Sequence, residues 1–157
     1  MSDYKASSVV FDPSKYLETR RFNREKLVLF NYIESMLNIN IDDIILLENS
    51  LFILLDNEKL EKLQSLKELR RILKLKLGIV VFIIPLTKDV ENMMYHVCDR
   101  DLVQNISCTW TQACIHVAIK LGEHDRHAFF KKFKPLLADI QVFLKILLMK
   151  EIKINIC

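Results

Sequence analysis

The chain has 157 residues, a length typical of one domain, and a formal net charge of +3. Hydrophobic residues make up 51% of the chain and charged residues 27%, which excludes a disordered chain. Only two glycines occur, Gly78 and Gly122, which excludes a P-loop, a dinucleotide-binding fingerprint and a Gly-x-Ser-x-Gly nucleophile elbow. Because neither a secretory signal nor a bilayer-length apolar run is present, we expect a soluble intracellular protein with reduced cysteines.

The N-terminal segment predicts a strand followed by a helix. The β-branched and aromatic run Ser7 to Phe11 indicates the strand, and Asp12 with the proline after it indicates a helix to about Arg21. The run Lys26 to Phe30 fits either a buried strand or a helical stripe that extends to Leu37. We favour the strand.

The middle of the chain predicts a βαβ unit. Two apolar runs, Ile44 to Leu47 and Leu51 to Leu55, indicate a hairpin of buried strands, with a continuous helix as the alternative. A leucine stripe then predicts a helix over 58–77 that ends at Gly78. The apolar run Ile79 to Ile84 follows as a central strand. A helix between two buried strands predicts that these strands are parallel.

The C-terminal half predicts mostly helices. Asp89 to Val103 indicates a helix, Ile106 to Trp110 a short strand, and Gln112 to Leu121 a helix that ends at Gly122. His127 to about Met149 indicates one or two closing helices. We therefore expect an α/β fold with a central, mostly parallel sheet and flanking helices over 1–122, and a helical C-terminal extension over 123–157 that packs on it.

Basic residues are bunched, although the net charge is small. The clusters are Arg20, Arg21, Arg24 and Lys26; Lys67, Arg70, Arg71, Lys74 and Lys76; and Lys131, Lys132 and Lys134. Each cluster fits a phosphate-binding patch or the solvated face of an amphipathic helix.

The residues that could hold a metal are poorly spaced for one. Two histidines and three cysteines fall within a short stretch: His96, Cys98, Cys108, Cys114 and His116. No Cys-x2-Cys or His-x3-His pair presents two ligands together, so we interpret the cysteines as buried structural residues and expect no metal and no cofactor. A cysteine nucleophile also lacks a glycine-rich turn that would expose it.

Acidic residues follow the second strand of the hairpin. Asp56, Glu58 and Glu61 lie where α/β proteins place active sites, and carboxylates there could hold magnesium. The alternative is that they stabilise the first turn of a helix, which we favour.

The order of elements resembles the nuclease-like domain of the XPF superfamily, over roughly residues 7–122. The resemblance depends on three strand segments, Ser8 to Phe11, Leu46 to Asp56 and Gly78 to Ile84, and on Ser107 to Ala113 as the last strand before a helix. Active members carry a Glu-Arg-Lys-x-x-x-Asp signature at the position of Asp56 to Glu61. The Arg-Lys pair and the final Asp are missing here, so the resemblance implies a pseudonuclease and no enzyme activity.

Two pseudonuclease families fit this resemblance: the Fanconi-anaemia core-complex partner and the meiotic crossover-promoting partner of the SHOC/Zip-type XPF-like protein. The first normally ends in glycine-containing helix-hairpin-helix repeats, and no glycine follows Gly122, which favours the meiotic type. The resemblance implies a non-catalytic nuclear subunit for DNA repair or meiotic recombination. It would form a heterodimer with an XPF-like protein and help it bind branched or junction DNA. We expect it to bind no membrane.

Candidate site residues follow from this function. Phosphate contacts require cations, for which the candidates are Lys67, Arg70, Arg71, Lys74, Arg20 and Arg21. A partner interface requires apolar and aromatic side chains, for which the candidates are Trp110, Phe129, Phe130, Phe133, Phe143 and Leu147. These aromatic residues fit an ordinary core equally well.

Two other functions remain open. An all-helical regulator resembling a viral apoptosis inhibitor would offer a groove to a partner helix, but it would place the β-branched run Ile79 to Ile84 in a helix. A metal-dependent nuclease would require Asp56 as a ligand, and we rank it last.

Overall fold

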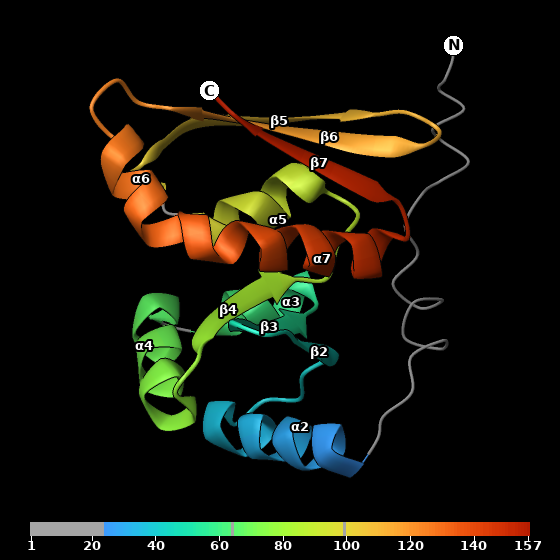
Figure 1. Cartoon of the computed structure of the whole chain (residues 1–157). Helices are drawn as coiled ribbons and strands as arrows, with labels where there is room; N and C mark the ends of the chain where they lie inside the picture. Colours follow the sequence, from blue (N-terminus) through green and yellow to red (C-terminus); the bar gives the residue numbers. More distant parts are fainter. Residues whose placement is uncertain (1–23, 64, 99) are drawn as a thin grey trace. The chain divides into compact units, whose positions relative to one another are not determined.

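The computed structural model describes residues 24–63, 65–98 and 100–157 (Figure 1). The described chain divides into two compact units, residues 24–87 and residues 88–157, and each is described by itself. The strand expected at Ser7 to Phe11, the helix to Arg21, and the candidates Arg20 and Arg21 lie outside the described residues. Among the described helices, none is both long enough and apolar enough to cross a membrane.

The first unit contains three helices and three strands. In chain order they are α2 (Arg24–Leu37), β2 (Asp43–Leu46), β3 (Ser50–Leu55), α3 (Asn57–Lys62), α4 (Leu66–Leu77) and β4 (Val80–Pro85). The strands form one sheet in the order β2-β3-β4. β2 pairs with β3 antiparallel and β3 pairs with β4 parallel, with Leu51 opposite Val81 and Ile53 opposite Ile83.

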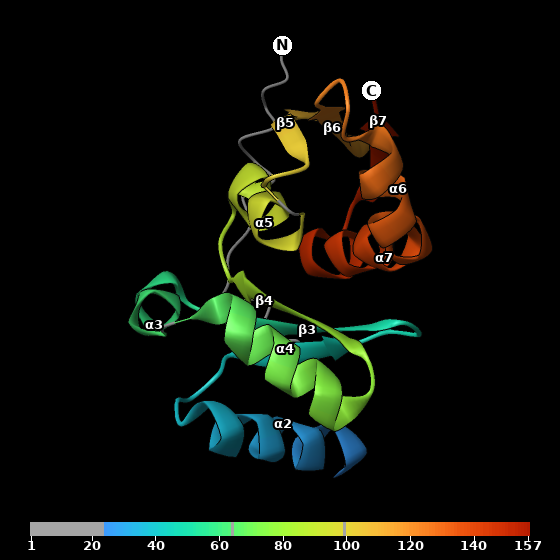
Figure 2. The same cartoon turned by 90° about the vertical axis from the view of Figure 1, so that its left-hand side faces the viewer.

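Helices α2 and α4 cover one face of this sheet (Figure 2). Ile33 and Leu37 from α2 and Leu73 from α4 pack there against alternate residues of β3 and β4. Each of these side chains is less than a tenth exposed. The strands β3 and β4 are buried along almost their whole length, which explains why their sequences have no polar alternation.

The second unit also contains three strands, with three α-helices and a 3-10 turn. In chain order they are α5 (Val90–Val97), β5 (Val103–Trp110), β6 (Cys114–Leu121), α6 (Arg126–Phe133), η2 (Lys134–Leu136), α7 (Leu137–Leu148) and β7 (Glu151–Ile156). The sheet order is β5-β6-β7, with β5 antiparallel and β7 parallel to β6. Figure 1 shows the helices of this unit on one side of its sheet.

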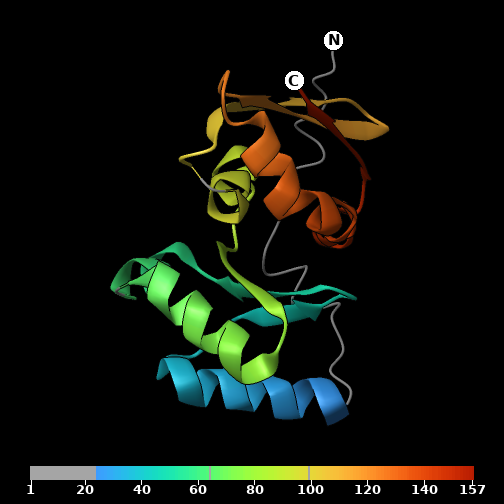
Figure 3. The same cartoon turned by 60° about the vertical axis from the view of Figure 1, so that its left-hand side comes forward.

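The two units repeat one arrangement. Each has the order helix, strand, strand, helix, helix, strand, and in each the middle strand pairs antiparallel with the first and parallel with the last. The helix pair between the second and third strands is α3 with α4 in the first unit, and α6 with α7 in the second (Figure 3). The chain therefore contains the same supersecondary unit twice, although its amino-acid sequence shows no repeat.

The prediction of a central, mostly parallel sheet is wrong. The structure has two separate three-stranded mixed sheets, and each contains one parallel and one antiparallel pair. The expected boundary at residue 122 also differs from the structure, in which the units meet at residues 87 and 88. The segment 123–157 is not a purely helical extension, because it supplies β7 to the second sheet. The all-helical alternative is wrong for the same reason.

The βαβ prediction in the first unit is confirmed. The runs that contain Ile44 and Leu51 form the hairpin β2-β3, and the strand after Gly78 is parallel to β3. Gly78 adopts φ +71°, the left-handed conformation expected of a helix stop. The helix expected over 58–77 is divided into α3 and α4, with Ser65 at φ +53° between them.

Two segments have the opposite secondary structure to the one expected. Lys26 to Phe30 lies in α2, because its stripe continues through Ile33 to Leu37 on the buried side of that helix. Gln112 to Leu121 was expected to be a helix, but Cys114–Leu121 is strand β6. Its buried residues, Ile115, Val117 and Ile119, recur with the period of a strand.

Candidate nucleic-acid interface

The turn between α3 and α4 presents lysines to solvent. Helix α3 starts at its cap Asp56, whose Oδ1 accepts a hydrogen bond from the Lys59 backbone N–H at 2.9 Å, and it ends after Lys62. Lys62 and Lys67 are exposed on either side of the turn. Ser65, the residue before α4, holds a left-handed conformation that a residue with a Cβ rarely adopts.

The equivalent turn of the second unit is more basic. It consists of the end of α6 and the short turn η2, where Lys131, Lys132 and Lys134 are exposed while Phe133 and Leu136 are buried. Between Arg126 and Ala138 the sequence has no acidic residue. The buried apolar side chains fix the turn to the unit and the three lysines beside them are exposed, so the turn presents positive charge without a neighbouring carboxylate in the sequence.

The cations predicted on α4 have different roles. The Nε of Arg70 donates to the carbonyl of Val81 at 3.2 Å, and its guanidinium lies 5.3 Å from the centre of the Phe82 ring. Arg70 therefore joins α4 to β4. Arg71 pairs with Glu68, and this hydrogen bond lowers the pKa of the Glu68 carboxyl. Lys67 and Lys74 are exposed and remain available for an anionic ligand.

Most of the residues proposed for a partner interface lie in the core. Phe129, Phe133, Phe143 and Leu147 are at most 1% exposed, and the Phe129 and Phe133 rings pack 4.9 Å apart. This corrects the interface prediction for these four, because a side chain with no exposed surface has none to offer a partner. Trp110 and Phe130 are half-buried, and they lie beside Lys150 and Arg126 respectively.

The acidic residues after β3 lie in α3 and at its start: Asp56 is the cap, Glu58 is in the first turn and Glu61 is near the end. Besides capping α3, Asp56 lies 3.8 Å from Lys59 Nζ, and the same ammonium lies 3.3 Å from Asp42. Lys59 therefore connects the start of β2 to the end of β3. No group of three His, Cys, Asp or Glu side chains in the described part of the chain could hold a metal ion. His96 bonds through Nδ1 to the carbonyl of Asn92 within its own helix.

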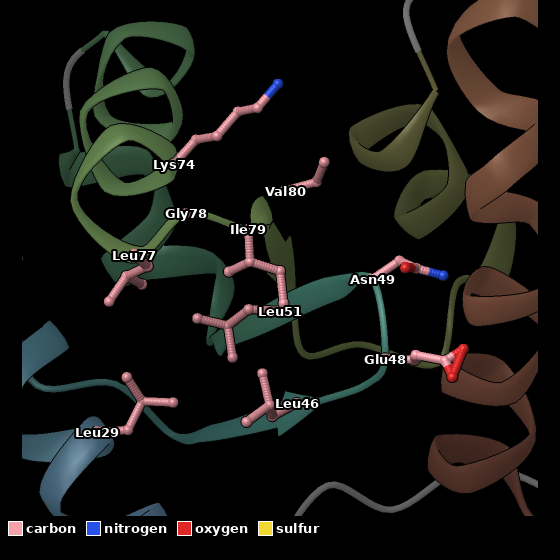
Figure 4. Close-up of a pocket in the computed structure, with 10 residues that line it drawn as sticks. All are labelled: Leu29, Leu46, Glu48, Asn49, Leu51, Lys74, Leu77, Gly78, Ile79 and Val80. Carbon is pink, nitrogen blue, oxygen red and sulfur yellow. The ribbon is translucent and has the colours of Figure 1, made fainter.

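A surface pocket of about 520 Å³ lies in the first unit, between α2, the β2-β3 turn and the junction of α4 with β4 (Figure 4). Its polar lining residues are Glu48, Asn49 and Lys74, and the remainder are leucines, Gly78, Ile79 and Val80. Figure 4 shows the Lys74 side chain extending away from the apolar lining. The two charged lining residues, Glu48 and Lys74, lie apart from each other in Figure 4, so the pocket shows no base paired with a nucleophile.

Cys108 is an unreactive thiol. Burial, together with the nearby carboxylates of Glu91 and Asp89, raises its pKa to about 12. At mildly alkaline pH we expect iodoacetamide to modify the exposed Cys157 first and to leave Cys108 unmodified, because only the thiolate is nucleophilic. Peptide mass mapping after timed alkylation measures this order. Equal rates for Cys108 and Cys157 would contradict it.

Comparisons with family models and with curated protein sequences found no match. Among solved structures 15 chains match, and one of them, the crystal structure of APE1850, superposes with a TM-score of 0.62. The superposition covers 87% of this chain and 100% of the other, at 18% sequence identity. At this identity the likeness shows a shared fold and nothing about function. None of these comparisons indicates an XPF-like domain.

Proposed function

We propose that this chain is a non-catalytic protein that binds single-stranded nucleic acid through the helix–helix turns of its two repeated units. The observation that carries the proposal is that exposed lysines occur at the same place in both units, Lys62 and Lys67 in the first and Lys131, Lys132 and Lys134 in the second. Two cationic turns at equivalent positions suit a ligand with a repeating negative charge, such as a phosphate backbone.

The arrangement of elements supports this choice at the level of fold. Two helices joined by a short loop and placed between parallel strands resemble the KH module, whose helix–helix loop holds the backbone of single-stranded nucleic acid. This is an analogy of fold and carries less weight than the charges themselves. It favours a single strand over the branched DNA expected from the sequence. The two three-stranded mixed sheets of the described residues differ from the central, mostly parallel sheet of the nuclease-like domain, so they give no support to a pseudonuclease role or an XPF-like partner.

The chain departs from the KH pattern in one respect. The KH loop is Gly-x-x-Gly, which lets backbone approach phosphate closely, whereas residues 63–66 here are Leu-Gln-Ser-Leu and the second turn contains Pro135. Contacts made by lysine side chains are longer and less directional than backbone contacts. We therefore expect modest affinity, little sequence preference and a strong dependence on salt.

Fluorescence anisotropy with a labelled single-stranded oligouridine tests the proposal. Changing Lys131 and Lys134 together to glutamate should weaken binding by about tenfold or more at moderate salt, because two cation–phosphate contacts become repulsive. The pair Lys62→Glu with Lys67→Glu should have a similar but smaller effect, because acidic residues such as Glu61 and Glu68 already lie near this turn in the sequence.

The matched control changes Lys120 and Lys153 to glutamate. Both lysines are exposed on strands of the second unit, away from its helix–helix turn, and this variant alters the net charge by the same amount. The control should bind within about twofold of the unmodified protein, since long-range electrostatics are screened in salt. Equal losses in control and turn variants, or no binding of the single strand at low salt, would contradict the proposal.

A further inference from the structure

An aromatic side chain lies between two cations on one face of α6. Phe130 is half-buried, whereas Arg126 and Lys134 are exposed. The three residues follow one another at intervals of four, so each lies about 6 Å along the helix axis from the next and on the same face. The helical turn extends to Lys134, because its backbone N–H donates to the carbonyl of Phe130. These three side chains are named the α6 stripe.

The core packing orients the Phe130 ring without burying it. Phe129 and Phe133 are at most 1% exposed, and their ring centres lie 4.9 Å apart. Phe130 meets Phe129 edge-on, with 5.8 Å between the ring centres. The guanidinium carbon of Arg126 lies 5.1 Å from the centre of the Phe130 ring. The second unit therefore holds an arginine–aromatic pair that is only partly buried.

The charges around this pair attract phosphate. Lys131 and Lys134 are exposed, and the sequence has no acidic residue between Arg126 and Ala138. A strand of nucleic acid that reaches these lysines brings its bases close to the pair, because Phe130 precedes Lys131 and lies one helical turn from Lys134. The α6 stripe thus places a flat, partly apolar surface beside the cations that would hold the backbone.

Another arginine–aromatic pair in the same unit has different surroundings. The guanidinium carbon of Arg100 lies 4.7 Å from the centre of the Tyr95 ring. Asp101 follows this arginine in the sequence, and Glu91 precedes the tyrosine by one turn of α5. Carboxylates repel phosphate, so this pair does not suit nucleic acid and provides a comparison for the α6 stripe.

We infer that the α6 stripe binds an unpaired nucleobase, which stacks against Arg126 and Phe130 while Lys134 contacts the adjoining phosphate. The inference rests on the proposed binding of single-stranded nucleic acid and names the base contact within it. Unpaired bases stack on aromatic rings and on guanidinium planes. Because every base has a π-face, the contact requires a base but selects little among sequences.

A ligand without bases separates this contact from the lysine contacts. Fluorescence anisotropy compares labelled oligouridine with an abasic ribose–phosphate oligomer of the same length and charge. The unmodified chain should bind oligouridine about tenfold more tightly, because only this ligand has bases that stack. Arg126→Lys and Phe130→Leu should each remove most of that difference. Neither change removes a positive charge, so the dependence of affinity on salt should stay the same.

Two further variants serve as controls. Arg100→Lys makes the same chemical change in the comparison pair and should preserve the tenfold difference between the two ligands. Changing Lys131 and Lys134 together to glutamate should weaken the binding of both ligands, because both carry the same phosphates. Arg126 is exposed, so Arg126→Lys tests the contact even if Phe130→Leu lowers stability.

The outcomes distinguish this inference from the proposed function. Equal affinity of the unmodified chain for oligouridine and the abasic oligomer, both weakened by the lysine double variant, would overturn the inference alone. A loss of the difference in Arg100→Lys as large as that in Arg126→Lys would also overturn it. No binding of either ligand at low salt would overturn the proposed function as well.

Discussion

Replacing Asp43 with asparagine is expected to lower the free energy of unfolding by about 3–5 kcal/mol. Asp43 is fully buried at the start of β2, where its Oδ1 lies 2.9 Å from Lys26 Nζ and accepts from the Ile44 backbone N–H at 2.8 Å. The Lys26 side chain is itself only 14% exposed. Removing the carboxylate takes away the ionised group that lies 2.9 Å from this largely buried ammonium ion, and the loss of that charge pairing is the main cost.

Urea denaturation followed by circular dichroism measures this loss. Glu151→Gln is the matched control, because it removes a carboxylate from the exposed pair with Lys145, whose partners are both more than half exposed. Exposed pairs contribute at most about 1 kcal/mol, so the control should unfold close to the unmodified chain. If Asp43→Asn and Glu151→Gln were equally stable, the Lys26–Asp43 pair would not join α2 to β2 as described.

Replacing Phe129 with alanine is expected to destabilise the second unit by about 3–5 kcal/mol. Phe129 is fully buried on α6, and its ring packs against Phe133 at 4.9 Å and edge-on to Phe130 at 5.8 Å. Truncation removes the apolar contact and leaves a cavity that a close-packed core fills only partly. Trp110, the one tryptophan in the chain, lies in the same unit and reports its unfolding by fluorescence.

Phe130→Ala is the control for this change. The neighbouring ring is half-buried and lies under the guanidinium of Arg126, so its loss should cost about 1 kcal/mol. A small loss for Phe129→Ala would restore these phenylalanines as interface residues. If Phe129 is a core residue, Phe129→Ala should instead lower the free energy of unfolding more than Phe130→Ala does.

The parallel pairing of β3 with β4 could be predicted from the sequence. The runs of Leu51 to Leu55 and Ile79 to Ile84 are continuously apolar, which is typical of strands buried on both faces. Gly78 marks the end of the intervening helix, and its left-handed φ confirms why a glycine occurs there. Local pattern and tertiary structure agree in this region, so the prediction was correct.

Strands β6 and β7 were missed although their sequences carry a signal. Ile115, Val117 and Ile119 alternate with His116 and Ala118, and this period of two indicates a strand more strongly than a helix. The segment from Glu151 to Ile156 alternates in the same way. The parallel pairing of β7 with β6 could not be predicted, because α6, η2 and α7 separate the two strands along the chain.

The candidate interface was predicted only in part. The cluster Lys131, Lys132 and Lys134 was visible in the sequence, but nothing there related it to Lys62 and Lys67. Their equivalence depends on the order of helices and strands, which is the same in both units. The amino-acid sequences of the two units do not resemble each other in the same way. The division between α3 and α4 could not be predicted either. Neither glycine nor proline occurs there, and the leucine stripe is present on both sides of the division.

Nuclear magnetic resonance mapping tests the nucleic-acid interface most directly. Adding single-stranded oligouridine to the ¹⁵N-labelled chain should shift the amide signals of residues 62–67 and 131–136 first, and the shifts should disappear as salt is raised. Amides of the second sheet, such as Ser107 and Lys153, should change little. Shifts concentrated on that sheet, or no shifts at all at low salt, would contradict the assignment of the helix–helix turns as the binding site.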